Sequence, residues 1–372
     1  MSETVAPNPK RSSRDPEELR NRMEVWLSSQ LPAGAMPRIP EVTSPSTNGM
    51  SSETLLFDAT WSEGGAERSG RFVARVEPDT ADVPIFRKYD LDLQFRLMKI
   101  VAENSSVPVP NARWIELDRQ AIGARFFVMD RVEGRVPPDV LPYNMDSWLL
   151  DASDSERKEL ETNSVRVLTQ LHGIDISSLD LSFLELSVPG ATPLRRHVQD
   201  WRDYYDWTRG DRRHPILDRG FAWLEDHWPE DEGETVLSWG DSRIGNILYQ
   251  GFAPSAVLDW EMGGLAPREI DIAWMIFLHS FFENIARQAG LSGMPDFLQR
   301  ETVAAKYEEL SGYEPKSLEF YEMYAAIRHG IIMARVFARQ VHFGEAEFGE
   351  DVDQPIMHRD LIEKMLDGSY WA

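Results

Sequence analysis

The spacing of apolar residues changes along the chain, and this change limits the folds that the chain can adopt. Between about residues 41 and 132, short runs alternate between apolar and polar positions. From about residue 142 onward, most apolar residues follow the 3.6-residue period of a helix. Because strands and helices are segregated in this way, the sequence predicts an α+β protein with a small antiparallel sheet and a larger, mostly helical part.

The first part should contain two strand pairs around one helix. The predicted strands are Leu55–Trp61, Gly70–Val76, Arg113–Leu117 and Arg125–Met129, and the predicted helix runs from about Val83 to Glu103. An earlier helix should begin at Asp15, where Pro16 suits the first helical position. Its predicted apolar face consists of Leu19, Met23, Trp26 and Leu27.

The second part should be helical except for one short strand-rich island. The predicted helices are Ser155–Leu171, Leu194–Tyr205, Ile216–Asp226, Ile270–Ala289, Phe297–Leu310 and Ser317–Val341. The island contains Val236–Trp239, Ile247–Tyr249 and Ala256–Trp260, joined by polar or glycine-containing turns. The expected domains are 1–40, a tail and helix, then 41–132, the sheet part, and 133–372, the helical part.

Charge and composition exclude several classes of protein. The net charge of −23 argues against a nucleic-acid-binding protein and against docking on anionic lipid, since both need a basic face. The absence of cysteine excludes disulfides, thiolate metal sites and a cysteine nucleophile. No apolar run has the length of a membrane span, and the N-terminus lacks the apolar core of a secretory signal. We therefore expect a cytoplasmic enzyme or binding protein.

The strand-rich island carries the residues with the clearest chemistry. Asp241 is followed five positions later by Asn246, and Asp259 comes at the end of a predicted strand. Phosphoryl transfer uses an aspartate to orient the attacking hydroxyl, and amide and carboxylate oxygens to bind Mg²⁺. A polar loop with a strand-end cap is the alternative explanation. The flanking strands and the preceding sheet favour a catalytic loop and a metal site.

The same residues resemble the aminoglycoside phosphotransferase family, which has a protein-kinase-like fold. The resembling segments are Trp239–Asn246, Val257–Glu261, Glu269–Trp274, Phe127–Gly134 and Leu171–His172, in the family's order. The similarity covers about residues 40–345 and is strongest to kinase-like domains fused to some acyl-CoA dehydrogenases. It implies a bilobal fold, a nucleoside triphosphate as co-substrate, Mg²⁺, and a small-molecule hydroxyl as acceptor; we expect ATP, and the choice between ATP and GTP stays open.

Carried over by position, the resemblance implies a role for each residue of the island. Asp241 is similar to the catalytic base, and Asn246 and Asp259 are similar to the Mg²⁺ ligands. Trp239 departs from the family, which usually has histidine there to organise the loop. His172 and Asp271 are expected to be structural, with Asp271 bracing the catalytic loop.

The resemblance also implies nucleotide contacts in the sheet part. Arg75 occupies the place of the phosphate-binding lysine, and the alternative is an exposed strand residue. Ser51 and Ser52 belong to a polar segment that is a weak phosphate loop or a surface turn. Met129, Asp130 and Val132 are expected to contact the nucleotide. Gln94 aligns with the glutamate that would pair with Arg75, so the ion-pair partner of Arg75 stays open.

Three functions compete at this point. The preferred hypothesis is an ATP-dependent small-molecule kinase. A nucleotide-binding pseudokinase is favoured by Trp239 and by the missing glutamate, whereas a protein kinase is disfavoured because no activation segment separates Met262–Pro267 from the next helix. For the acceptor, an uncharged or amphipathic hydroxylated metabolite is preferred over an aminoglycoside, because the helical part is rich in large apolar side chains.

Overall fold

The computed structural model describes residues 16–44, 53–78 and 83–371, and these form two compact units. One unit contains residues up to Phe95 together with Asn111–Arg131. The other contains Arg96–Pro110 together with the chain from Val132 onward. Residues 96–110 therefore join the helical unit, which the sequence did not suggest. The predicted domains 1–40, 41–132 and 133–372 stay a prediction, because compactness does not test which segment binds a ligand.

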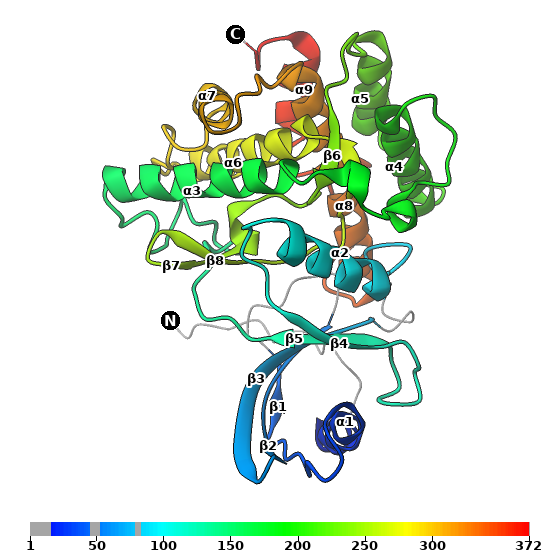
Figure 1. The fold of residues 1–372 in the computed structure, drawn as a ribbon. Helices are drawn as coiled ribbons and strands as arrows, with labels where there is room; N and C mark the ends of the chain where they lie inside the picture. Colours follow the sequence, from blue (N-terminus) through cyan, green and yellow to red (C-terminus); the bar gives the residue numbers. More distant parts are fainter. Residues whose placement is uncertain (1–15, 45–52, 79–82, 372) are drawn as a thin grey trace, which may run out of the picture. The chain divides into compact units, whose positions relative to one another are not determined.

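The first unit is built on a five-stranded antiparallel sheet with strand order β1-β2-β3-β5-β4 (Figure 1). Its strands are β1 (Val42–Thr43), β2 (Glu53–Glu63), β3 (Ala66–Val76), β4 (Ala112–Glu116) and β5 (Phe126–Asp130). The long hairpin β2–β3 turns at Gly64 and Gly65, which both have positive φ. The four predicted strands are therefore confirmed, in the predicted order.

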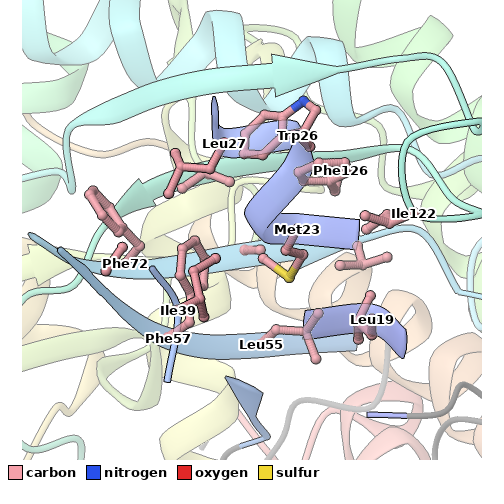
Figure 2. Packing of buried hydrophobic residues seen from close by; sticks show 14 of the residues in the cluster. Leu19, Met23, Trp26, Leu27, Ile39, Leu55, Phe57, Phe72, Ile122 and Phe126 are labelled. Atoms are coloured by element: carbon pink, nitrogen blue, oxygen red, sulfur yellow. The ribbon is translucent and has the colours of Figure 1, made fainter. Parts of the chain in front are cut away.

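Helix α1 (Pro16–Gln30) packs against this sheet and completes its core (Figure 2). The four residues predicted to form its apolar face are all buried, at 6% exposure or less. The ring of Trp26 meets that of Phe126 on β5 edge-to-face, with 4.6 Å between centroids. Trp26 also donates a hydrogen bond from Nε1 to Glu116 Oε2 at 3.1 Å, so α1 is fixed to β4 as well.

The second unit is mostly helical and carries two short antiparallel strand pairs. Strand β6 (Thr235–Ser238) pairs with β9 (Gly264–Pro267), and β7 (Ile247–Gln250) pairs with β8 (Ala253–Val257). The helices are α3 (Asp154–His172), α4 (Pro193–Arg209), α5 (Pro215–Asp226), α6 (Glu269–Gln288), α7 (Arg300–Ser311), α8 (Leu318–His342) and α9 (Arg359–Asp367). Helix α2 (Leu91–Asn104) continues from the first unit into the second.

Helix α2 and the last strand of the island have limits in the structure that differ from the predicted ones, and strand β9 is an addition. Helix α2 begins at Leu91 and not near Val83, because Asp90 caps it by accepting a hydrogen bond from the Leu93 N–H at 2.9 Å. The last island strand stops at Val257, because Asp259 has a φ of +54°, which a strand does not accommodate. Strand β9 was not predicted, since its four residues include glycine and proline and show no alternation.

Within residues 16–44, 53–78 and 83–371, no helix combines the length and the apolar character needed to span a membrane.

Candidate active site

The two strand pairs of the helical unit place the predicted catalytic and metal-binding residues close together. Asp241 lies in the loop that follows β6, and Asn246 ends a 3₁₀ turn just before β7. Asp259 lies in the loop between β8 and β9. The backbone connects these loops, because the Leu258 N–H donates to the Asn246 carbonyl at 2.9 Å.

The Asp241 carboxylate is held by side chains from three directions. Trp274 on α6 donates from Nε1 to Oδ1 at 2.7 Å, and Asn246 donates from Nδ2 to Oδ2 at 2.7 Å. Arg243 approaches both oxygens with Nε at 3.2 Å. Burial and the neighbouring Asp259 carboxylate raise the pKa of Asp241 to about 6, against the opposing hydrogen bonds from Trp274 and Asn246. The carboxylate is thus fixed in orientation and electrostatically coupled to Asp259.

Asn246 and Asp259 offer the donor atoms that Mg²⁺ prefers. Both hydrogen bonds that the Asn246 side chain gives to Asp241 use Nδ2, which turns its Oδ1 away from Asp241. An amide oxygen and a carboxylate are hard ligands that suit Mg²⁺, which keeps several waters and needs few protein ligands. In the described part of the chain, no group of three or more His, Cys, Asp or Glu side chains could hold a metal. A magnesium site here would therefore rely on this amide–carboxylate pair.

Arg243 is a site residue that the sequence reasoning did not select. Besides contacting Asp241, it forms an ion pair from Nη1 to Asp139 Oδ2. Gly245 makes room for this contact, because a Cβ there would lie 2.5 Å from Asp139 Oδ1. The clue in the sequence was a cation two residues after the candidate base. The partner Asp139, more than a hundred residues earlier, could not be read from the sequence.

Asp271 braces the loop that carries Asp241, as the family resemblance implied. Its carboxylate accepts hydrogen bonds from the Trp239 N–H at 2.8 Å and the Gly240 N–H at 2.7 Å. His172 contacts the same carboxylate at 3.0 Å. Burial alone would raise the pKa of Asp271, but the hydrogen bonds from His172 and the two backbone N–H groups hold this pKa below its ordinary value. His172 is fully packed, so its structural role is confirmed.

Arg328 on α8 holds the same loop by donating a hydrogen bond to a backbone carbonyl of that loop. Its Nη2 donates to the Gly240 carbonyl at 3.0 Å, and its guanidinium lies over the rings of Trp274 and Trp201 at 4.5 and 4.8 Å. The side chain is 1% exposed. Its positive charge acts on Asp241 and Asp271, so the buried site contains a cation as well as carboxylates.

Trp239 tethers the loop that carries Asp241 to the loop that carries Asp259. Its indole Nε1 donates to the Leu258 carbonyl at 2.8 Å and lies 3.2 Å from the Asp259 carbonyl. Gly240 lets the loops approach, because its φ is +84° and a Cβ there would lie 2.0 Å from the Met262 carbonyl oxygen. Trp239 therefore positions the backbone at Asp259, which explains how the loop is organised without a histidine.

The tether gives a first prediction. Trp239→Phe keeps an aromatic ring but leaves the Leu258 carbonyl without its donor, and it should lower the free energy of unfolding by about 1–3 kcal/mol. Urea denaturation followed by circular dichroism measures this. Trp228→Phe is the matched control, since Trp228 donates to Glu232 on another part of the unit and should weaken stability less. Equal losses in the two variants would mean that the tether is energetically unimportant.

The residues expected to bind the nucleotide lie mainly in the first unit. Arg75 on β3 is 8% exposed and donates from Nη1 to Thr54 Oγ1 at 3.1 Å, so the exposed-strand explanation is wrong. Met129 and Asp130 end β5, where Met129 is buried and Asp130 forms an ion pair with Arg113 at 2.8 Å. Val132 is half-buried in the second unit. Ser51 and Ser52 lie outside the described residues.

Comparison with known proteins identifies the family. The chain belongs to the phosphotransferase enzyme family, whose model matches residues 55–308. Among individual relatives, a "Probable acyl-CoA dehydrogenase" of Arabidopsis thaliana is 23% identical over 345 residues, which is 86% of this chain. The match covers 39% of that relative, so this chain spans about two fifths of its length.

Solved structures show the same fold. A "putative aminoglycoside phosphotransferase" from Ralstonia eutropha JMP134 superposes with a TM-score of 0.66 at 21% identity, covering 93% of this chain and 97% of that one. A thermostable mutant of aminoglycoside phosphotransferase APH(4)-Ia, solved with AMP-PNP and hygromycin B, superposes with a TM-score of 0.52 at 16% identity, covering 94% and 99%. The chain therefore has the α+β, protein-kinase-like bilobal fold that the sequence predicted.

Proposed function

We propose that this protein transfers the γ-phosphoryl group of ATP to a hydroxyl of a small molecule. The observation that carries the proposal is the geometry at Asp241. Its carboxylate is buried, oriented by Trp274 and Asn246, and coupled to the Asp259 carboxylate. Phosphoryl transfer needs little more from a protein than positioning and charge stabilisation, and this arrangement supplies both.

Each residue of the site has a role in this reaction. The Asp241 carboxylate accepts the proton of the acceptor hydroxyl as that oxygen bonds to the γ-phosphorus, and the bond from phosphorus to the β–γ bridging oxygen breaks to release ADP. Asn246 and Asp259 would hold Mg²⁺, which neutralises charge on the phosphates when it is bound. Arg243, which contacts Asp241, would stabilise the charge on the transferred group.

The acceptor is proposed to be an uncharged or amphipathic hydroxylated metabolite. Helix α4 supports this choice, because it carries a group of aromatic side chains, one of which lies against Arg328, the residue that donates to the Gly240 carbonyl. Trp201 lies against Arg328, and Tyr204 stacks on the partly exposed Trp207 at 5.7 Å. An aminoglycoside would need several carboxylates that converge on one site. Hygromycin B in the APH(4)-Ia complex makes an aminoglycoside the second candidate.

The test of the function is phosphate transfer by the purified protein. ATP turnover should depend on magnesium and should increase with members of a panel of hydroxylated compounds, and mass spectrometry should detect a product heavier by one phosphoryl group. The pseudokinase alternative predicts ATP binding without turnover or product. Trp239 no longer favours that alternative, since its indole tethers the loop at Asp259.

Arg75 gives a second prediction. Arg75→Ala should raise the dissociation constant of ATP about 10–150-fold, because a charge-assisted contact to phosphate is worth about 1.5–3 kcal/mol. Isothermal titration calorimetry at fixed magnesium measures this, and the magnesium dependence should stay nearly the same. Arg71→Ala, on the same strand but exposed, is the matched control. An unchanged dissociation constant in the Arg75 variant would remove this residue from the nucleotide site.

A further inference from the structure

Two buried histidines lie close to the site but have no part in the proposed chemistry. His329 on α8 is 7% exposed, and His358, just before α9, is fully buried. Their Nδ1 atoms are 3.3 Å apart, within hydrogen-bond reach. Both rings pack against Phe281 on α6, at centroid distances of 4.7 and 5.4 Å. The pair is therefore a fixed polar group in an apolar surrounding.

The hydrogen bonds determine where the protons of this pair lie. His358 Nε2 is 2.9 Å from the Ala326 carbonyl, which can only accept, so Nε2 carries a proton. In a neutral His358, Nδ1 is then an acceptor, and His329 must donate to it from its own Nδ1. His329 Nε2 consequently carries no proton and presents a lone pair. Burial lowers the pKa of His358 to about 4 and holds the pKa of His329 well below its ordinary value, which keeps both rings neutral.

The lone pair of His329 is not used by a hydrogen bond within the described part of the chain. His329 Nε2 has no hydrogen-bond partner among the described residues, and it is not completely buried. The ring lies edge-to-face with Trp274 at 6.2 Å, and Trp274 is the donor to Asp241. The charge of Arg243, which contacts Asp241, reaches His329 and contributes to its lowered pKa. His329 is thus one aromatic ring away from the catalytic carboxylate.

We propose that His329 is a specificity-determining residue whose Nε2 accepts a hydrogen bond from a second hydroxyl or N–H group of the acceptor. The surroundings define the rest of the ligand. Phe281 packs on the histidine ring, and Ile332 and Met333 on the next turn of α8 are half-buried apolar side chains. The preferred acceptor would therefore have an apolar body and a second donor near the hydroxyl that reacts. This rests on the function proposed above.

Nitrogen NMR of the full chain, labelled with ¹⁵N-histidine, tests the first step. His329 Nε2 should give a pyridine-type resonance and His358 Nε2 a pyrrole-type resonance, with His329→Phe used to assign the signals. The ligand probes are the vicinal cyclohexanediols, and cyclohexanol is the matched control without the second donor. The diols should shift the His329 Nε2 resonance saturably and bind about tenfold more tightly than cyclohexanol, which is the effect of one hydrogen bond.

The variants separate binding from folding and from catalysis. His329→Phe should bind diol and alcohol equally, whereas His342→Phe, at an exposed position of α8, should keep the diol preference. A proton on His329 Nε2, or equal binding of diol and alcohol by the wild-type protein, would overturn the proposal. Absence of magnesium-dependent ATP turnover while the diol preference persists would instead disprove the proposed function and leave the ligand contact of His329 intact.

Discussion

Asp241→Asn is expected to lower turnover ~10²–10⁴-fold, the range for loss of a positioned general base, while the affinity for ATP stays nearly unchanged. The carboxylate acts on the acceptor hydroxyl and does not contact the phosphates in the proposed reaction. The substitution is close in shape, and an amide oxygen can still accept the hydrogen bond from Trp274 Nε1. Single-turnover kinetics with saturating acceptor and magnesium measure the effect on the chemical step.

Two controls make this result specific. Asp211→Asn changes an exposed aspartate of the same unit and should leave turnover unchanged. Calorimetric titration of the Asp241 variant with ATP should give nearly the wild-type dissociation constant. If the variant turned over at a comparable rate, Asp241 would have no role in the mechanism. If turnover and affinity fell together, the loss would point to a disturbed loop.

The local parts of this site could be predicted from the sequence. Asp241, Asn246 and Asp259 lie within a short stretch, and the strands that flank them are also local, so the spacing together with the predicted strands and the family resemblance grouped them. The bracing role of Asp271 came from the family resemblance, which places an aspartate at the start of helix α6. The structure shows both oxygens of Asp271 bound to backbone N–H groups of the loop that carries Asp241.

Contacts between residues that lie far apart in the sequence could not be predicted. Arg328 reaches the Gly240 carbonyl from 88 residues further along the chain, and its direction depends on how α8 packs against α6. The contact of Arg243 with Asp139 also joins residues that are far apart in the sequence. Burial also depends on tertiary packing, so the choice between an exposed and a buried Arg75 needed the structure. Periodicity identifies elements and faces but does not identify partners across elements.

Substitution of a proposed metal ligand should have a different effect from substitution of the proposed base. Asp259→Asn should raise the magnesium concentration needed for half-maximal ATP binding at least ~10–100-fold and should lower turnover with it, because a charged oxygen ligand is lost. Asparagine is the better substitution here, since the residue has a φ of +54° and asparagine tolerates this conformation, whereas alanine would add about 1–2 kcal/mol of backbone strain. A fall in stability would otherwise be confused with a loss of metal.

The contrast between ATP binding with and without magnesium tests this assignment. Calorimetry at several magnesium concentrations should show weaker MgATP binding in the Asp259 variant, while binding of ATP in the presence of a chelator should match the wild-type protein. Asp241→Asn serves as the internal comparison, because it should keep the magnesium dependence and lose only turnover. Equal MgATP affinity in the Asp259 variant and the wild-type protein would show that the metal, if it binds, does not use this carboxylate. The coupling between Asp259 and Asp241 would then be electrostatic alone.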